Sequence, residues 1–72
     1  MERYRNLNGD SGVAAYEIHP DSIRVQFNNT AKVYVYSYAR AGREHVEQMK
    51  RLAAGGSGLN SYIMRNVQKL YD

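Results

Sequence analysis

Residues 22–38 read SIRVQFNNTAKVYVYSY, and this stretch decides the fold because two alternating segments flank a short polar one. Ile23, Val25 and Phe27 fall on one side of an extended chain, while the polar residues between them fall on the other. This alternation predicts a half-buried β-strand over 22–27. Residues 31–38 are rich in β-branched and aromatic side chains, which predicts a second strand. The two asparagines between them tolerate turn conformations, so a β-hairpin is expected.

The tyrosines of the second strand alternate, so they share one face of the sheet. They are Tyr34, Tyr36 and Tyr38. The register of the hairpin decides which face, because a shift of one residue turns the whole set over. On an exposed face the rings form a platform on which unpaired bases stack, each contact contributing about 1–3 kcal/mol. On an inward face the rings belong to the core.

Two registers are compatible with this sequence. A two-residue turn at the asparagines pairs Ile23 with Tyr34 and directs the tyrosines inward. Turn chemistry favours it, because the alternative places Thr30 in an unfavourable left-handed conformation. A three-residue loop pairs Val25 with Val33 and leaves the tyrosines exposed. The tyrosine hydroxyl groups favour this second register, because buried hydroxyls need hydrogen-bond partners. Both alternatives stay open.

The segments around the hairpin complete the predicted fold. Residues 13–18 are mostly apolar and precede Pro20, which lacks an N–H group, so they predict the first strand. After Gly42 the apolar spacing changes to that of a helix, which Gly55 and Gly56 are expected to end. A second helix carries an apolar stripe made of Leu59, Tyr62, Ile63, Val67, Leu70 and Tyr71. The predicted class is α+β, a three-stranded antiparallel meander followed by two helices packed on one face (βββαα).

Length and composition limit the organisation of the chain. Seventy-two residues suit one domain, which we place at residues 12–72. Residues 1–11 are polar and rich in turn formers, so a flexible N-terminal arm is expected there. The chain has no cysteine, which excludes disulfides and thiolate metal sites. No apolar run matches a secretory leader or a membrane span, so we expect a cytoplasmic protein that does not bind membranes.

The stretch SGVAAYEIHPDSIRVQFNNTAKVYVYSY and the later GSGLNSYIMRNVQKLY resemble the KTSC domain. The likeness spans about residues 11–71 and includes the hallmark Tyr-x-Tyr, here Tyr34-Val35-Tyr36, and a closing segment from Gly58 to Tyr71. Leu59 departs from the family, which usually has an aromatic residue there. This family occurs at the C-terminus of some lysyl-tRNA synthetases and as small bacterial and phage proteins. The resemblance implies RNA binding by association with a tRNA enzyme.

A basic, tyrosine-rich surface is the predicted binding site. Its candidate residues are Arg24, Lys32, Tyr34, Tyr36, Tyr38, Arg40, Arg43, Arg65 and Lys69. The net charge of +3 favours polyanions, because cations gain affinity by releasing counterions from phosphates. Arg65 and Lys69 lie one turn apart without an acidic neighbour in their helix, although a solvated helix face accounts for them better than a phosphate-binding role.

No catalytic or metal-binding set is readable. His19 and His45 lack the cysteines or carboxylates that a zinc site needs, and Ser57 in the GGSG loop has no nucleophile context. We therefore expect no cofactor, no metal, no small-molecule substrate and no enzyme activity. Two functions remain: a module that binds RNA or other single-stranded nucleic acid, and a protein-interaction module. An example of the second is a phage or accessory regulator that docks on a host transcription machine, RNA polymerase.

Overall fold

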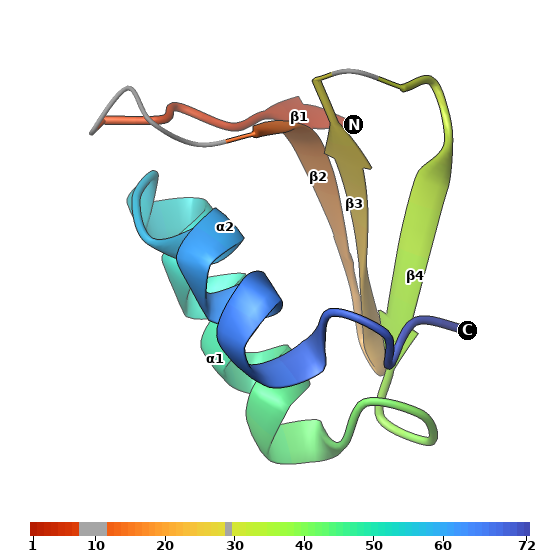
Figure 1. Cartoon of the computed structure of the whole chain (residues 1–72). Coiled ribbons are helices and arrows are strands. Elements are labelled where there is room, and N and C mark those ends of the chain that lie inside the picture. Colours follow the sequence, from red (N-terminus) through yellow and green to blue (C-terminus); the bar gives the residue numbers. More distant parts are fainter. Residues whose placement is uncertain (8–11, 29) are drawn as a thin grey trace.

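In the part of the chain that the structure describes, four antiparallel strands, joined in chain order, form one sheet (Figure 1). The structure is a computed structural model, and it describes residues 1–7, 12–28 and 30–72. The strands are β1 (Glu2–Arg3), β2 (Val13–His19), β3 (Ser22–Phe27) and β4 (Val33–Ser37), and the helices are α1 (Arg43–Gly55), α2 (Leu59–Tyr62) and the π-helix η1 (Ile63–Val67). The predicted α+β class is confirmed.

The strand β1 corrects the prediction of three strands. Glu2 pairs with Tyr16 and Arg3 with Ala15, which adds an edge to the sheet. Tyr4 follows directly and is only 4% exposed. The N-terminal segment is therefore partly built into the domain, and the folded part begins before residue 12. The polar composition of this segment did not indicate a strand, because both residues of β1 are exposed and the buried side chain, Tyr4, lies just after them. Residues 8–11 of the expected arm lie outside the described residues.

The pairing of β3 with β4 settles the face of the tyrosines. Ile23 lies opposite Tyr36 and Val25 opposite Tyr34, so the tyrosines share the face of the apolar residues of β3. Tyr36 is 1% exposed and belongs to the core, whereas Tyr34 and Tyr38 are half-buried against it. Of the two alternatives that the sequence left open, the structure therefore has the inward one, and the central ring of the tyrosine row is enclosed.

The hairpin connection is longer than either expected turn. β3 ends at Phe27 and β4 begins at Val33, so residues 28–32 join them. Thr30 N donates to Phe27 O at 3.4 Å, and Thr30 Oγ1 accepts from Lys32 N at 3.1 Å. The threonine thus satisfies backbone groups inside the loop. The register differs from that of a two-residue turn by an even number of residues, which keeps the tyrosines inward.

Strand β2 contains a bulge that aims its large side chains at the core. Val13 pairs with Phe27, but Ala15 pairs with Gln26, so the register shifts between them. Val13 and Tyr16 are three positions apart and both buried, which regular alternation does not allow. The bulge changes the alternation and brings both residues to the covered face.

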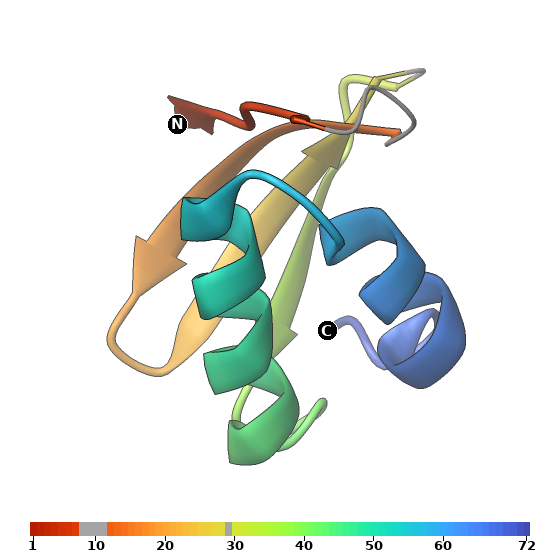
Figure 2. The same ribbon diagram turned by 90° about the vertical axis from the view of Figure 1, so that its left-hand side faces the viewer.

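Both helices cover one face of the sheet (Figure 2). The fully buried side chains come from the sheet, from α1 and from the second helix: Ile23, Val25, Tyr36, Val46, Met49, Leu59, Ile63 and Val67. The second helix ends earlier than its apolar stripe predicts, because Val67 is the last residue of η1 and Leu70 and Tyr71 follow outside it. Gly56, at φ 83°, caps α1 in a left-handed conformation that glycine adopts without strain.

Tyr4 gives a direct test of the N-terminal segment. Its hydroxyl oxygen accepts a hydrogen bond from the backbone N–H of Leu59, the first residue of α2, at 3.2 Å in the buried interior. Changing Tyr4 to Phe leaves this buried N–H without its partner, so the free energy of unfolding falls by about 1–3 kcal/mol. Urea unfolding of both proteins measures the difference. An unchanged midpoint would mean that this segment does not hold the helix.

Candidate functional site

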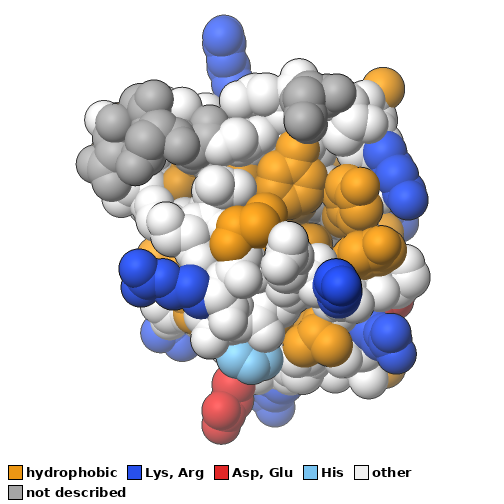
Figure 3. Space-filling view, in the orientation of Figure 1, with side chains coloured by type: hydrophobic (Ala, Val, Ile, Leu, Met, Phe, Trp, Pro, Cys, Tyr) orange, Lys and Arg blue, Asp and Glu red, His pale blue; other side chains and the backbone are white. Residues whose placement is uncertain are grey.

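An open groove of about 630 Å³ lies between the sheet and the second helix. Strands β3 and β4 and the loop between them line one side, and α2, η1 and the residues after η1 line the other. The lining residues are Gly12, Phe27, Asn28, Thr30, Tyr34, Tyr36, Asn60, Ile63, Met64, Gln68, Lys69 and Tyr71. Figure 3 shows hydrophobic side chains gathered on this face, with Lys and Arg side chains around them. Concave sites lined by apolar groups with a few polar ones are typical of ligand-binding sites.

Aromatic rings in edge-to-face contact form the sheet side of the groove. The ring centres of Phe27 and Tyr34 are 5.5 Å apart, and those of Tyr34 and Tyr71 are 4.8 Å apart. Tyr71 also meets the buried Tyr36 at 6.4 Å. Such pairs prefer this geometry because the positive edge of one ring faces the negative face of the other. The rings therefore stabilise one another along this wall of the groove.

The segment after η1 brings Tyr71 into the groove. Asp72 N donates to Val35 O of β4 at 2.7 Å, and Ser37 Oγ donates to Asp72 Oδ1 at 2.8 Å. These two bonds attach the segment to the outer edge of β4. Tyr71 is thereby held beside Tyr34 rather than on the helical stripe that its spacing predicted.

Two lysines give the groove its charge. Lys32 Nζ lies 5.0 Å from the ring centre of Tyr34 and 5.7 Å from that of Tyr71, both within the range of a cation–π contact. Lys69 lines the groove from the opposite side. Among the described residues that line the groove, none is acidic. The Asp72 carboxylate, next to Tyr71, accepts a hydrogen bond from Ser37 and keeps its negative charge. Lys32 and Lys69 favour anions in the groove, and Asp72 opposes them near Tyr71.

Tyr38 and Arg43, which were expected to join this surface, form a separate cluster at the other end of β4. The guanidinium of Arg43 lies 5.8 Å from the ring centre of Tyr38, and Lys50 Nζ lies 5.4 Å from it. The Tyr38 hydroxyl donates a hydrogen bond to Glu47, and Lys50 pairs with Glu47 at 3.1 Å. The hydrogen bond from Tyr38, and after it the contact with Lys50, hold the pKa of Glu47 below its usual value. The cluster connects the end of β4 to α1, with Lys50 paired to Glu47 and Arg43 over the Tyr38 ring.

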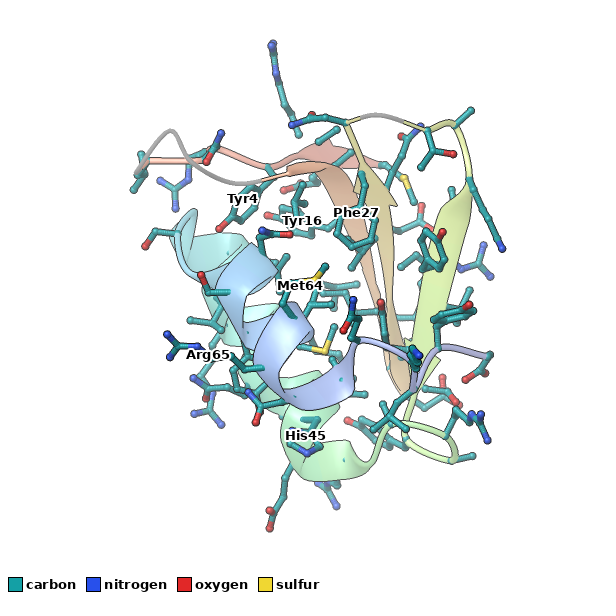
Figure 4. All side chains as sticks on the ribbon, viewed as in Figure 1. Tyr4, Tyr16, Phe27, His45, Met64 and Arg65 are labelled. Carbon is teal, nitrogen blue, oxygen red and sulfur yellow. The ribbon has the colours of Figure 1, made fainter. Side chains whose placement is uncertain are left out.

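The remaining arginines of the predicted site do not converge on the groove. Arg24 pairs with Val35, so it lies on the opposite face of the sheet from the tyrosines. Arg40 is exposed in the turn before α1. Arg65 extends away from Phe27 and the sheet, on the far side of the helix (Figure 4). The structure thus brings together Lys32, Tyr34, Tyr36 and Lys69 and separates the other five candidates.

Nine of the lining residues named above were not among the predicted site residues, and Phe27, Asn60, Met64 and Tyr71 are four of these nine. Phe27 and Met64 lie on either side of its opening (Figure 4), and Met64 is 45% exposed. Of these residues, Met64 could have been found from the sequence. It is a large apolar residue that lies beside the apolar stripe of the second helix rather than on it, which indicates an exposed apolar side chain. The aromatic contact of Tyr71 was not detectable, because it depends on where the helix ends.

The described part of the chain contains no group of three side chains arranged to hold a metal ion. Within the same residues, no helix is long and apolar enough to cross a membrane. His45 Nδ1 lies 2.7 Å from the hydroxyl of Tyr62, and His19 Nε2 lies 2.6 Å from a Glu17 oxygen, so each histidine has a local partner.

Comparison with protein-family models, with curated proteins and with solved structures finds no match to this chain.

The enclosure of Tyr36 predicts a loss of stability at alkaline pH. Burial first, and then the neighbouring Tyr34 and Tyr71, raise the pKa of Tyr36 from 10.0 to about 12. Above pH 10 the unfolded chain releases this proton while the folded chain keeps it, so the free energy of unfolding falls as the pH rises towards 12. Urea unfolding between these pH values should show a smaller fall for Tyr36→Phe. An equal fall in both proteins contradicts the assignment.

Proposed function

We propose that this chain is a non-catalytic binding module that holds single-stranded nucleic acid, RNA in the first place, in the aromatic groove. The observation that carries the proposal is the combination of rings and lysines with no acidic side chain among the described lining residues. Single strands differ from most ligands in offering flat apolar bases and regularly spaced negative charges. A groove with apolar walls and cationic borders matches both features.

Different residues of the groove are suited to bind the bases and the phosphates of a single strand. Phe27 and Met64, at the opening, supply apolar surface against which a base packs. Lys32 and Lys69, on opposite sides, supply charges for the flanking phosphates. Duplexes hide their bases in the stack, so a groove of this kind favours unpaired strands.

Two further observations support an RNA ligand. The chain has a net charge of +3, which favours polyanions. The resemblance to the KTSC domain, which stays a prediction, associates the chain with a tRNA enzyme. The half-buried Tyr34 and enclosed Tyr36 change the expected mode of binding: bases enter at the border of the tyrosine row and do not stack along it.

Neutralising Lys69 should weaken binding to mixed-sequence single-stranded RNA. Lys69→Gln removes one phosphate contact, so the slope of log Kd against log salt should decrease in magnitude by about 0.7–1. Fluorescence anisotropy at several salt concentrations measures this slope. Arg65→Gln is the matched control, because it also removes one positive charge. Arg65 lies on η1, four residues before Lys69, and points away from the sheet. Equal weakening by both changes, or no RNA binding at low salt, rules out the groove.

A protein ligand has one observation in its favour. Met64 is 45% exposed beside Phe27, and methionine is common on surfaces that adapt to partners. A regulator that docks on RNA polymerase is one form of this alternative. If RNA fails to bind and a nuclease-treated pull-down yields one stoichiometric partner whose binding Met64→Glu abolishes, the protein alternative replaces the first.

A further inference from the structure

Two amide side chains line the groove without a hydrogen-bond partner in the described chain. They belong to Asn60, on α2, and to Gln68, directly after η1. Gln68 is exposed, so its amide is free to form hydrogen bonds with the solvent. Asn60 is half-buried, and a Cβ atom built on Gly12 would stand 3.7 Å from its Oδ1 atom. The Asn60 amide therefore lies inside the groove, close to the backbone of the neighbouring segment.

An amide suits one part of a nucleic acid and not the other. A phosphate group offers only acceptors, which the ammonium groups of Lys32 and Lys69 already match. The edge of an unpaired base offers donors and acceptors side by side, and an asparagine amide presents the same pair in complementary order. Asn60 is thus matched to a base edge.

The position of Asn60 agrees with this role. Phe27 and Met64 border the opening of the same groove, so a base packed between them extends its edge inwards, towards residues such as Asn60. We propose that Asn60 reads the edge of one unpaired base held at this opening, so that binding depends on the base and not on the backbone alone. This inference rests on the proposed function and adds specificity to it.

Short RNA homo-oligomers of adenine, cytosine and uracil test the inference by anisotropy. The unaltered protein should bind the best and the worst of them with affinities that differ by at least about fivefold. Asn60→Leu, which keeps the size of the side chain but removes its hydrogen bonds, should bring the affinities to within about twofold of one another. Asn66→Leu is the control, because Asn66, on η1 directly after α2, carries the same amide but is exposed and donates from Nδ2 to Tyr62 O at 3.1 Å.

A second readout needs no variant. Abasic sites in the best-bound oligomer keep its phosphates but remove both the base edge and the packing against Phe27 and Met64, so they should lower its affinity to or below that of the worst-bound one. If all oligomers, abasic ones included, bind alike, base reading is overturned while nucleic-acid binding stands. If affinities differ but Asn60→Leu leaves the differences intact, Asn60 is not the reading group. If nothing binds, the proposed function itself fails, and this inference fails with it.

Discussion

The structure depends on the register between β3 and β4. Because Ile23 lies opposite Tyr36, the tyrosine ring is placed under the helices, where it is 1% exposed. Burying such a ring contributes a large apolar area to a core that a short chain can hardly enlarge by other means. A shift of one residue in β4 would turn this ring to the outer face and bring Val33 and Val35 inward in its place.

The groove is a consequence of that register. Because Tyr34 and Tyr36 face the helices, their rings contact those of Phe27 and Tyr71. The four rings together form one aromatic wall of the groove. The opposite wall contains the π-helix η1 (Ile63–Val67), a form of helix often found at functional sites. After η1 the chain turns back to β4, so Lys69 and Tyr71 both reach the groove. Apolar walls and cationic borders are thus brought together by elements that are distant in the sequence.

Much of the fold could be predicted because it depends on local patterns. The alternation of residues 22–27, the β-rich residues 31–38 and the helical spacing after Gly42 predicted β3, β4 and α1. The strand β1 escaped prediction, since two exposed polar residues carry no apolar pattern. The length of the hairpin loop escaped it too, because Thr30 satisfies the backbone through its side chain. Of the candidate site, Tyr34 and Tyr36 on β4, Lys32 in the loop before it and Lys69 after η1 were grouped correctly. The distribution of arginines depends on how helices rotate against the sheet, which sequence spacing does not determine.

Mapping of backbone amide shifts by NMR, with a single-stranded RNA added stepwise, tests the central claim most directly. The account predicts that the signals of Phe27, Asn60 and Met64 move together and saturate at one Kd. The signal of Arg24, on the opposite face of the sheet, should stay in place. Movements centred on Arg24 or Arg43, with the groove residues unchanged, would contradict the claim that the tyrosine register creates the binding site.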